Sequence, residues 1–387
     1  MKNIQCLNKI AAIGTSKLDK AEYNVGTDVQ NPDAIMVRSA AMHDMEFGKE
    51  LLAIARAGAG VNNIPVDRCS KEGIVVFNTP GANANAVKEL AICALMLASR
   101  NIAGGIEWAK TLKGTEGVAK AVEAGKSKFA GVEVMGKTLG VIGLGAIGGL
   151  VANAAVHLGM NVVGCDPFLS IDAAWNINHH VVKAPTFDEV FKTADYVTLH
   201  VPSTPDTKGM INAQTLANMK DGVRIINLAR ADLVNAADMK AALESGKVAA
   251  YVTDFPTEDV LEMPGVVAIP HLGASSAEAE DNCAVMAAVQ LDDYLRYGNI
   301  KNSVNFPNVS MPVVCGHKRI CVLHANVPAV ISGITTLLSE SGANIENMIN
   351  KSKGDNAYTL VDFTGDLADT VVEKILAIAG VARVRVI

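Results

Sequence analysis

Three polar residues have side chains suited to proton and hydride chemistry on a carbonyl, and each follows an apolar segment: Arg230, Glu258 and His271. Histidine exchanges a proton near neutral pH, which makes His271 the candidate acid–base. A carboxylate beside the imidazole would orient it, a role for Glu258 or, as an alternative, its neighbour Asp259. A planar guanidinium binds a substrate carboxylate in bidentate fashion, which suits Arg230. Together these residue types indicate oxidation or reduction of a 2-hydroxy acid.

A glycine-rich segment predicts where the redox cofactor binds. Residues 137–142 are apolar enough for a buried parallel strand, and Gly143, Gly145 and Gly148 follow in a GxGxxG pattern that opens a helical segment, 146–159. These glycines permit a tight turn, close approach of a pyrophosphate and close helix–strand packing. Asp166 ends the next predicted strand, 160–165, where a carboxylate binds ribose hydroxyls and repels a 2′-phosphate. The sequence therefore predicts a dinucleotide site for NAD.

The elements that must position these residues form an α/β protein. Alternating strands and helices from about residue 131 predict a doubly wound Rossmann sheet, whose carboxyl edge is where ligands bind. The first ninety residues predict a second, flavodoxin-like α/β unit, and helices over 83–99 and 275–297 join the two. We therefore expect a discontinuous substrate-binding domain (1–98 and 282–310) around an NAD-binding domain (99–281).

The C-terminal residues 318–387 form a third predicted domain. The pattern strand, helix, strand, strand, helix, strand is a ferredoxin-like βαββαβ plan. Gly342 is placed to end the first helix, and Gly354-Asp355 suits a hairpin turn. Residues 307–318 contain the proline and glycine of a linker.

The composition of the chain limits the classes of protein to which it can belong. The 387 residues are 50% hydrophobic and carry a formal net charge of −6, without the basic runs typical of partners of nucleic acid or anionic membranes. Seven scattered cysteines form no CxxC pair, so we expect reduced thiols, no bound metal and no disulfide. No apolar stretch approaches the roughly 20 residues of a membrane span, and we expect a cytoplasmic protein.

Four motifs in this order, Val-Ile-Gly-Leu-Gly-Ala-Ile-Gly, Leu-His-Val-Pro, Asn-Leu-Ala-Arg and Pro-His-Leu-Gly-Ala-Ser, resemble the D-2-hydroxyacid dehydrogenase family over residues 30–305. The resemblance implies that Arg230 binds the substrate carboxylate, His271 is the acid–base and Glu258 its partner. Two departures are Ala231, where the family usually has glycine, and a segment from Asp254 to Glu258 that is one residue short. The same motifs imply further cofactor contacts at Ala146, Ile147, Val201, Pro202, Thr207, Leu228, Ala229, Asp254 and Gly273.

The substrate-side segments Val37-Arg38-Ser39 and Gly58 to Ile64 resemble those of family members that oxidise D-3-phosphoglycerate to 3-phosphohydroxypyruvate, the first step of phosphorylated L-serine biosynthesis. The resemblance implies substrate contacts at Arg38, Ser39, Gly60, Asn83 and Arg230. Ala40 and Ala41 stand where a second arginine is common, which leaves the phosphate to other groups, with Lys126 and Lys128 as candidates. Other readings are a dehydrogenase for D-lactate or phosphoerythronate, and an NADH-sensing binding protein.

The C-terminal domain resembles the ACT regulatory domains of the same family members. The resemblance implies an L-serine effector site at His324, Asn326 and Asn344, although Ala329 replaces a customary glycine and could crowd an effector. A purely dimerising domain is the alternative. The apolar residues 90–98 suit a core or a dimer interface, and the family implies a homodimer or homotetramer.

Overall fold

The computed structural model describes residues 1–313 and 316–387, and the chain divides into two compact units. One unit comprises Met1–Ala82 and Glu280–Ile387, and the other comprises Asn83–Ala279. We call them the first unit and the nucleotide unit. Val314 and Cys315, which belong to the predicted linker and to the predicted reduced thiols, lie outside the described residues.

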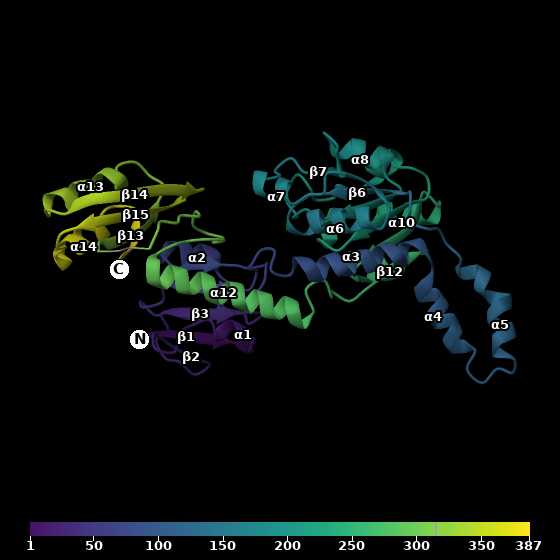
Figure 1. The fold of residues 1–387 in the computed structure, drawn as a ribbon, viewed down its shortest axis with the longest axis horizontal. Helices are drawn as coiled ribbons and strands as arrows, with labels where there is room; N and C mark the ends of the chain where they lie inside the picture. Colours follow the sequence, from purple (N-terminus) through teal and green to yellow (C-terminus); the bar gives the residue numbers. More distant parts are fainter. Residues whose placement is uncertain (314–315) are drawn as a thin grey trace. The chain divides into compact units, whose positions relative to one another are not determined.

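The nucleotide unit is built on a seven-stranded parallel sheet in the order β12-β11-β10-β9-β6-β7-β8 (Figure 1). Its short strands are apolar because helices cover both faces. The strands are β6 (Thr138–Ile142), β7 (Asn161–Cys165), β8 (Val182–Lys183), β9 (Tyr196–Leu199), β10 (Val223–Asn227), β11 (Val248–Thr253) and β12 (Val266–Ala268). The order reverses between β6 and β9, which is the switch point where a Rossmann sheet binds its ligand. The predicted doubly wound sheet is confirmed.

Two groups of helices cover the sheet of the nucleotide unit. On one face α3 and α6 enclose a core with Leu95, Val151 and Val252, and on the other α8, α9 and α10 enclose Phe191, Leu216 and Met239. The helices are α3 (Ala84–Ser99), α4 (Ile102–Thr111), α5 (Val118–Gly125), α6 (Ala146–His157), α7 (Ile171–Trp175), α8 (Phe187–Thr193), α9 (Ala213–Ala217), α10 (Ala236–Glu244) and α11 (Glu258–Leu261), with 3₁₀ turns η1 (Lys126–Phe129) and η2 (Ala231–Leu233). The apolar face of α3 is thus core of this unit, although the sequence-based boundary at residue 98 places it in the substrate-binding domain.

The first unit contains a five-stranded parallel sheet in the order β2-β1-β3-β4-β5. One of its faces packs against the long helix α12 (Ala277–Tyr297) through Ala287, Leu291 and Leu295. The other strands and helices are β1 (Lys2–Leu7), β2 (Tyr23–Gly26), β3 (Ala34–Val37), β4 (Ala53–Arg56), β5 (Val75–Phe77), α1 (Ala12–Thr15) and α2 (Val66–Lys71). This parallel sheet agrees with the flavodoxin-like prediction.

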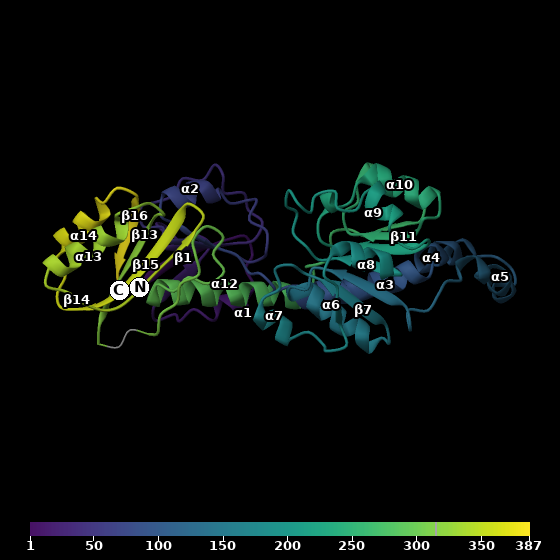
Figure 2. The ribbon, with the colours of Figure 1, turned by 90° about the horizontal axis from the view of Figure 1, so that it is seen from above.

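The C-terminal module is a four-stranded antiparallel sheet in the order β14-β15-β13-β16. The βαββαβ prediction is confirmed by β13 (Lys318–Ala325), α13 (Val330–Glu340), β14 (Asn344–Lys353), β15 (Asn356–Thr364), α14 (Asp369–Leu376) and β16 (Val381–Val386). The two helices cover one face, as Figure 2 shows. From the other face Leu323, Tyr358 and Leu360 join the core around α12. The module therefore shares a hydrophobic core with the rest of the first unit.

A buried ion pair fixes this module to the end of α12. Arg319 is fully buried, and its guanidinium meets Asp362 in bidentate fashion at 2.6 and 3.0 Å. Its remaining N–H groups donate to the carbonyls of Tyr297 and Pro312, both at 2.7 Å. The arginine is thus a bridge between β13, β15, the end of α12 and the segment that follows it.

Within residues 1–313 and 316–387, no single helix has the length and apolar character needed to cross a membrane. Helices α3 and α4 pass that test only as a pair, bent by 68°.

We predict that Asp362→Ala destabilises the first unit by about 3 to 5 kcal/mol, because it leaves the Arg319 charge buried without its partner. Urea unfolding followed by circular dichroism measures the change. Asp366→Ala is the matched control, since Asp366 pairs with Lys318 at 2.9 Å on the surface and its loss should not shift the midpoint measurably. Equal midpoints for the two variants would contradict the structural role of the buried pair.

Candidate active site

The glycine loop after β6 has the geometry of a pyrophosphate cradle. Gly143 has φ +87°, and a methyl group on Gly148 would lie 1.9 Å from the Gly143 carbonyl oxygen. Gly145, at the N-terminal end of α6, has open space where a side chain would point. The amides of the first turn of α6 therefore face space that a phosphate can enter, and the helix dipole favours an anion there.

Asp166 lies at the end of β7 beside this loop. Its carboxylate accepts hydrogen bonds from the backbone N–H of Leu144 and of Phe168, both at 2.9 Å. Asp166, the residue predicted to bind the ribose, therefore also holds the glycine loop against the end of β7. Ala146 and Ile147 are the first residues of α6, as the dinucleotide pattern predicts.

A second loop follows β9 at the same edge of the sheet. Val201 and Pro202 continue directly from this strand, and the Thr207 hydroxyl donates to the Pro202 carbonyl at 2.6 Å while accepting from the N–H of Thr204 at 2.9 Å. The Thr207 side chain therefore stabilises this loop through hydrogen bonds to its backbone. His200, at the start of the loop, packs behind α6, and burial lowers the pKa of its imidazole to about 4. Its imidazole is therefore neutral near physiological pH and contributes to packing.

Arg230 is held by an asparagine that the sequence analysis did not single out. Asn227 ends β10 fully buried, and its side-chain oxygen accepts from the N–H groups of Ala229 and Arg230 at 3.2 and 3.4 Å. Its amide donates to the Arg230 carbonyl at 2.8 Å. This clamp shapes the turn after Leu228 and leaves the guanidinium of Arg230 at the surface, where a carboxylate can reach it. Asn227 is the first residue of the Asn-Leu-Ala-Arg motif, so the motif itself could have identified this clamp.

His271 follows β12, next to the end of β11. Its ring packs edge-on against Phe255, with 4.9 Å between ring centroids. Asp254, which ends β11, is only 1% exposed, and among the described residues neither of its carboxylate oxygens has a hydrogen-bond partner. Burial raises the pKa of this carboxyl, and the shift is partly offset by the charge of His271, by the nearby backbone N–H groups of Gly273 and Asp254, and by the charge of Arg230. The structure thus gathers Arg230, Asp254 and His271 at one edge of the sheet, together with Gly273.

Glu258 is not bonded to His271. It is the exposed first residue of α11, after the N-cap Thr257, and no hydrogen bond or ion pair joins it or Asp259 to the imidazole within the part of the chain that the structure describes. Its carboxylate instead lies in the first turn of α11, where the helix dipole stabilises a negative charge. The predicted pairing is therefore absent from this structure.

The substrate-side residues of the first unit lie at the carboxyl end of its parallel strands. Arg38 and Ser39 follow β3, and Asn8, at the end of β1, accepts from the N–H groups of Ser39 and Ala40 at 3.0 and 2.8 Å. The Arg38 guanidinium pairs with Glu280 on α12 at 2.6 Å. Asn8 itself has a left-handed backbone conformation, with φ +69°, and its two hydrogen bonds order this loop. It was not identified from the sequence.

Arg56, which the sequence analysis did not identify, is a second arginine beside Arg38. It ends β4 in register with Val37 of β3, and its Nε donates to the Arg38 carbonyl at 3.1 Å. A methyl group on Gly58 would lie 2.1 Å from its guanidinium, so this glycine leaves room for the arginine. Burial lowers the pKa of Arg56, and the charge of Arg38 acts in the same direction. Adjacent parallel strands, rather than adjacent residues, bring the two cations together.

The remaining predicted substrate residues have simpler surroundings. Gly60 lies in the loop after β4, and Asn83 is the N-cap position of α3 in the nucleotide unit, without a capping side-chain bond. Lys126 forms a surface pair with Glu123, and Lys128 is an exposed residue of η1. Nothing in the nucleotide unit groups these two lysines with Arg230 or His271.

The predicted effector residues all have partners inside the C-terminal module. His324 is 3% exposed and bonds to Thr359 at 2.9 Å and to the Ala325 carbonyl at 2.7 Å. Asn326 donates to the Gly354 carbonyl at 3.2 Å, and Asn344 to Glu346 at 2.8 Å. Ala329 adopts φ +70°, a conformation that favours glycine. The resembled family's preference for glycine at this position therefore has two explanations, the positive φ angle and the space that a ligand would need.

Comparisons with known proteins agree with this geometry. Residues 93–273 match the family model "D-isomer specific 2-hydroxyacid dehydrogenase, NAD binding domain". A curated D-3-phosphoglycerate dehydrogenase from Synechocystis is 36% identical over 320 residues, covering 80% of this chain and 55% of that protein. Saccharomyces cerevisiae D-3-phosphoglycerate dehydrogenase 1 is 29% identical, covering 87% of this chain and 74% of that protein. The chain spans little more than half the length of most of these relatives.

Solved structures show the same fold. The NAD⁺-bound 3-phosphoglycerate dehydrogenase of Entamoeba histolytica superposes with a TM-score of 0.60 at 27% identity, covering 79% of this chain and 98% of that one. D-mandelate dehydrogenase of Rhodotorula graminis superposes with a TM-score of 0.67 at 23% identity, covering 81% of this chain and 99% of that one. The glycine cradle, the acidic residue after β7 and the Arg230 and His271 motifs stand in the matched region, and the nucleotide unit binds NAD. The chain belongs to the D-2-hydroxyacid dehydrogenase family.

Proposed function

We propose that the protein oxidises D-3-phosphoglycerate to 3-phosphohydroxypyruvate with NAD, the reaction that opens the phosphorylated route to L-serine. Several curated relatives carry the name of this enzyme at about 36% identity. The observation that carries the proposal is the Arg38 and Arg56 pair. Arg56 has no carboxylate partner among the described residues, and two neighbouring guanidinium groups suit a phosphorylated acid better than an uncharged substrate side chain.

The residues of the nucleotide unit suit this chemistry. NAD, when bound, accepts the hydride that leaves carbon 2 of the substrate. His271 takes the hydroxyl proton, and Arg230 holds the carboxylate beside the reacting carbon. The oxygens of Asp254, which have no hydrogen-bond partner of good geometry among the described residues, fit a cofactor amide donor, since a buried carboxylate without such a partner is costly. We also propose cofactor contacts at Gly143, Gly145, Gly148 and Asp166.

Glu258 as the partner that orients His271 is supported by the family motif alone. The carboxyl group that feels the His271 charge in this structure is Asp254. Asp254 is therefore the sharper target for a test of how the imidazole and the cofactor are held.

His271→Gln should lower kcat by about 10² to 10⁴, because no side chain remains to take the substrate proton. Steady-state NADH formation with D-3-phosphoglycerate measures the loss, and NADH fluorescence should show that cofactor binding is retained. His157→Gln, at an exposed position near the end of α6, is the control and should keep normal turnover. Normal turnover in His271→Gln would exclude this residue as the acid–base.

Asp254→Asn should stabilise the protein without cofactor by about 1 kcal/mol at neutral pH while weakening NADH binding. Because the folded-state pKa of this carboxyl is raised, the ionised form is penalised at neutral pH, and the penalty disappears as pH falls through the folded pKa. The difference in melting temperature between the wild type and the variant should therefore shrink in acid. A variant that is less stable at pH 7 would mean that the carboxylate has a stabilising partner.

Arg56→Gln should raise KM for D-3-phosphoglycerate about ten- to a hundredfold, the cost of one lost charge-assisted contact. The matched control is Arg100→Gln, since Arg100 is exposed after α3 and its side chain has no hydrogen bond or ion pair among the described residues. Parallel assays with D-lactate and phosphoerythronate identify the preferred acid. Higher turnover of D-lactate than of D-3-phosphoglycerate by the wild type would overturn the proposed substrate.

The assembly and location are also proposals. We propose a homodimer or larger homo-oligomer, supported by the exposed apolar residues Ile102 and Ile106 on α4 and Val118 on α5. A cytoplasmic location is supported by six free cysteines among the described residues. L-serine as effector of the C-terminal module is supported by its βαββαβ fold, and binding would have to exchange the internal bonds of His324, Asn326 and Asn344. Inhibition of NADH formation by added L-serine tests this site.

A further inference from the structure

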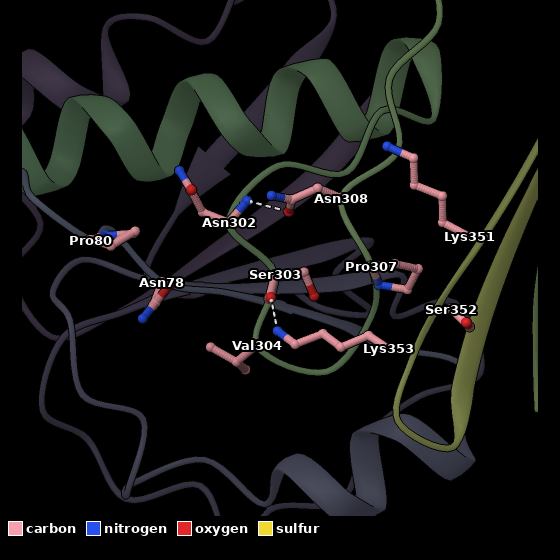
Figure 3. A pocket seen from close by; sticks show the side chains of 10 residues that line it. All are labelled: Asn78, Pro80, Asn302, Ser303, Val304, Pro307, Asn308, Lys351, Ser352 and Lys353. Carbon is pink, nitrogen blue, oxygen red and sulfur yellow. Dashed lines mark hydrogen bonds between the residues drawn. The ribbon is translucent and has the colours of Figure 1, made fainter. Parts of the chain in front are cut away.

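The first unit contains a pocket that belongs to neither the predicted substrate residues nor the predicted effector residues. It has a volume of about 670 Å³ and lies between the end of β14 and the segment that follows α12 (Figure 3). Its polar wall is formed by Asn78, Asn302, Ser303 and Asn308 on one side and by Lys351, Ser352 and Lys353 on the other. This volume is in the range of sites for small metabolites.

The charges of the pocket have one sign. Lys351 and Lys353 are two residues apart on β14, so their side chains leave the strand on the same side. No aspartate or glutamate is among the residues that line the pocket. The chain as a whole has a net charge of −6, so this local excess of positive charge differs from the average surface. An anion is the ligand that two such ammonium groups favour.

Several donors in the pocket have no partner among the described residues. Lys351 forms no hydrogen bond or ion pair within residues 1–313 and 316–387, while Lys353 uses one N–H to donate to the Ser303 carbonyl at 2.8 Å. Asn308 accepts from the N–H of Asn302 at 2.9 Å, which leaves its own side-chain N–H groups available. Asn302 adopts φ +60°, and its side-chain amide bonds to no described residue. The pocket thus combines positive charge with amide donors at fixed positions.

The wall of the pocket is connected to the substrate-side loop. The backbone N–H of Asn78 bonds to the Asn302 carbonyl at 3.3 Å, and its side-chain amide donates to the Ala59 carbonyl at 2.6 Å. Ala59 lies between Gly58, which makes room for Arg56, and Gly60. A ligand in the pocket would therefore contact the C-terminal module and a residue bonded to the loop beside the arginine pair.

We propose that this pocket binds a small anion that carries a phosphate or carboxylate group, held by Lys351, Lys353 and the side-chain amides of Asn302 and Asn308. It is a second ligand site of the first unit, separate from the residues proposed for substrate and for L-serine. The ligand joins the β14–β15 hairpin to the segment after α12.

The test uses the full chain and two probes, inorganic phosphate and citrate, in isothermal titration calorimetry at constant ionic strength. Lys351→Met removes the lysine that has no protein partner and should weaken binding of the effective probe by about tenfold. Lys374→Met, at an exposed position on α14 in the same module, removes equal charge elsewhere and should leave the affinity unchanged. Amide hydrogen exchange of residues 351–356 gives a local readout at the pocket itself.

Weaker binding in Lys351→Met alone, with slower exchange at residues 351–356 when the wild type is saturated, supports the site. Binding of phosphate but not citrate, or of citrate but not phosphate, then identifies whether the pocket recognises a phosphate or a carboxylate group. The proposal is overturned if neither probe binds, if Lys351→Met and Lys374→Met weaken binding equally, or if exchange at the hairpin is unaffected. None of these readouts depends on turnover, so a failure here is distinguishable from a wrong substrate assignment.

Discussion

The close approach of helix α6 to strand β6 is the constraint on which the nucleotide unit depends. A methyl group at Gly148 would overlap the Gly143 carbonyl oxygen at 1.9 Å, so no residue with a side chain can stand there without moving the helix. That contact brings the first turn of α6 to the carboxyl edge of the sheet. Asp166 then secures the loop through the Leu144 N–H. The same edge carries the turns of Arg230, Asp254 and His271, because parallel strands all end on one side.

Asp254 places a buried carboxyl group at this edge of the sheet. This carboxyl group is 1% exposed, and among the described residues its oxygens have no hydrogen-bond partner of good geometry; it is therefore unfavourable when ionised, and burial raises its pKa. The positive charges of His271 and Arg230 offset only part of the cost. This uncompensated burial is the observation behind the proposed cofactor contact at Asp254.

The first unit is organised around α12. One face of its parallel sheet and one face of the C-terminal antiparallel sheet share a core with this helix, and the buried Arg319–Asp362 pair bonds to the helix end. Arg383 on β16 also donates to the Lys49 and Glu72 carbonyls, both at 3.0 Å. The C-terminal module is thus attached to the substrate-side sheet by apolar packing and by charge. A ligand that moves the module would also act on the strands that carry Arg38 and Arg56.

The sequence alone determined the elements and their chemistry. Apolar runs predicted the buried parallel strands, the glycine spacing predicted the cradle, and the βαββαβ order followed from local periodicity and turn residues, because all of these depend on near neighbours in the chain. Tertiary structure decided which side chains meet. Arg56 joins Arg38 through strand register, Asn8 accepts hydrogen bonds from the loop after the neighbouring strand β3, and Glu258 has no bond to His271 among the described residues. Such contacts depend on the relative positions of whole elements, which local sequence patterns do not encode.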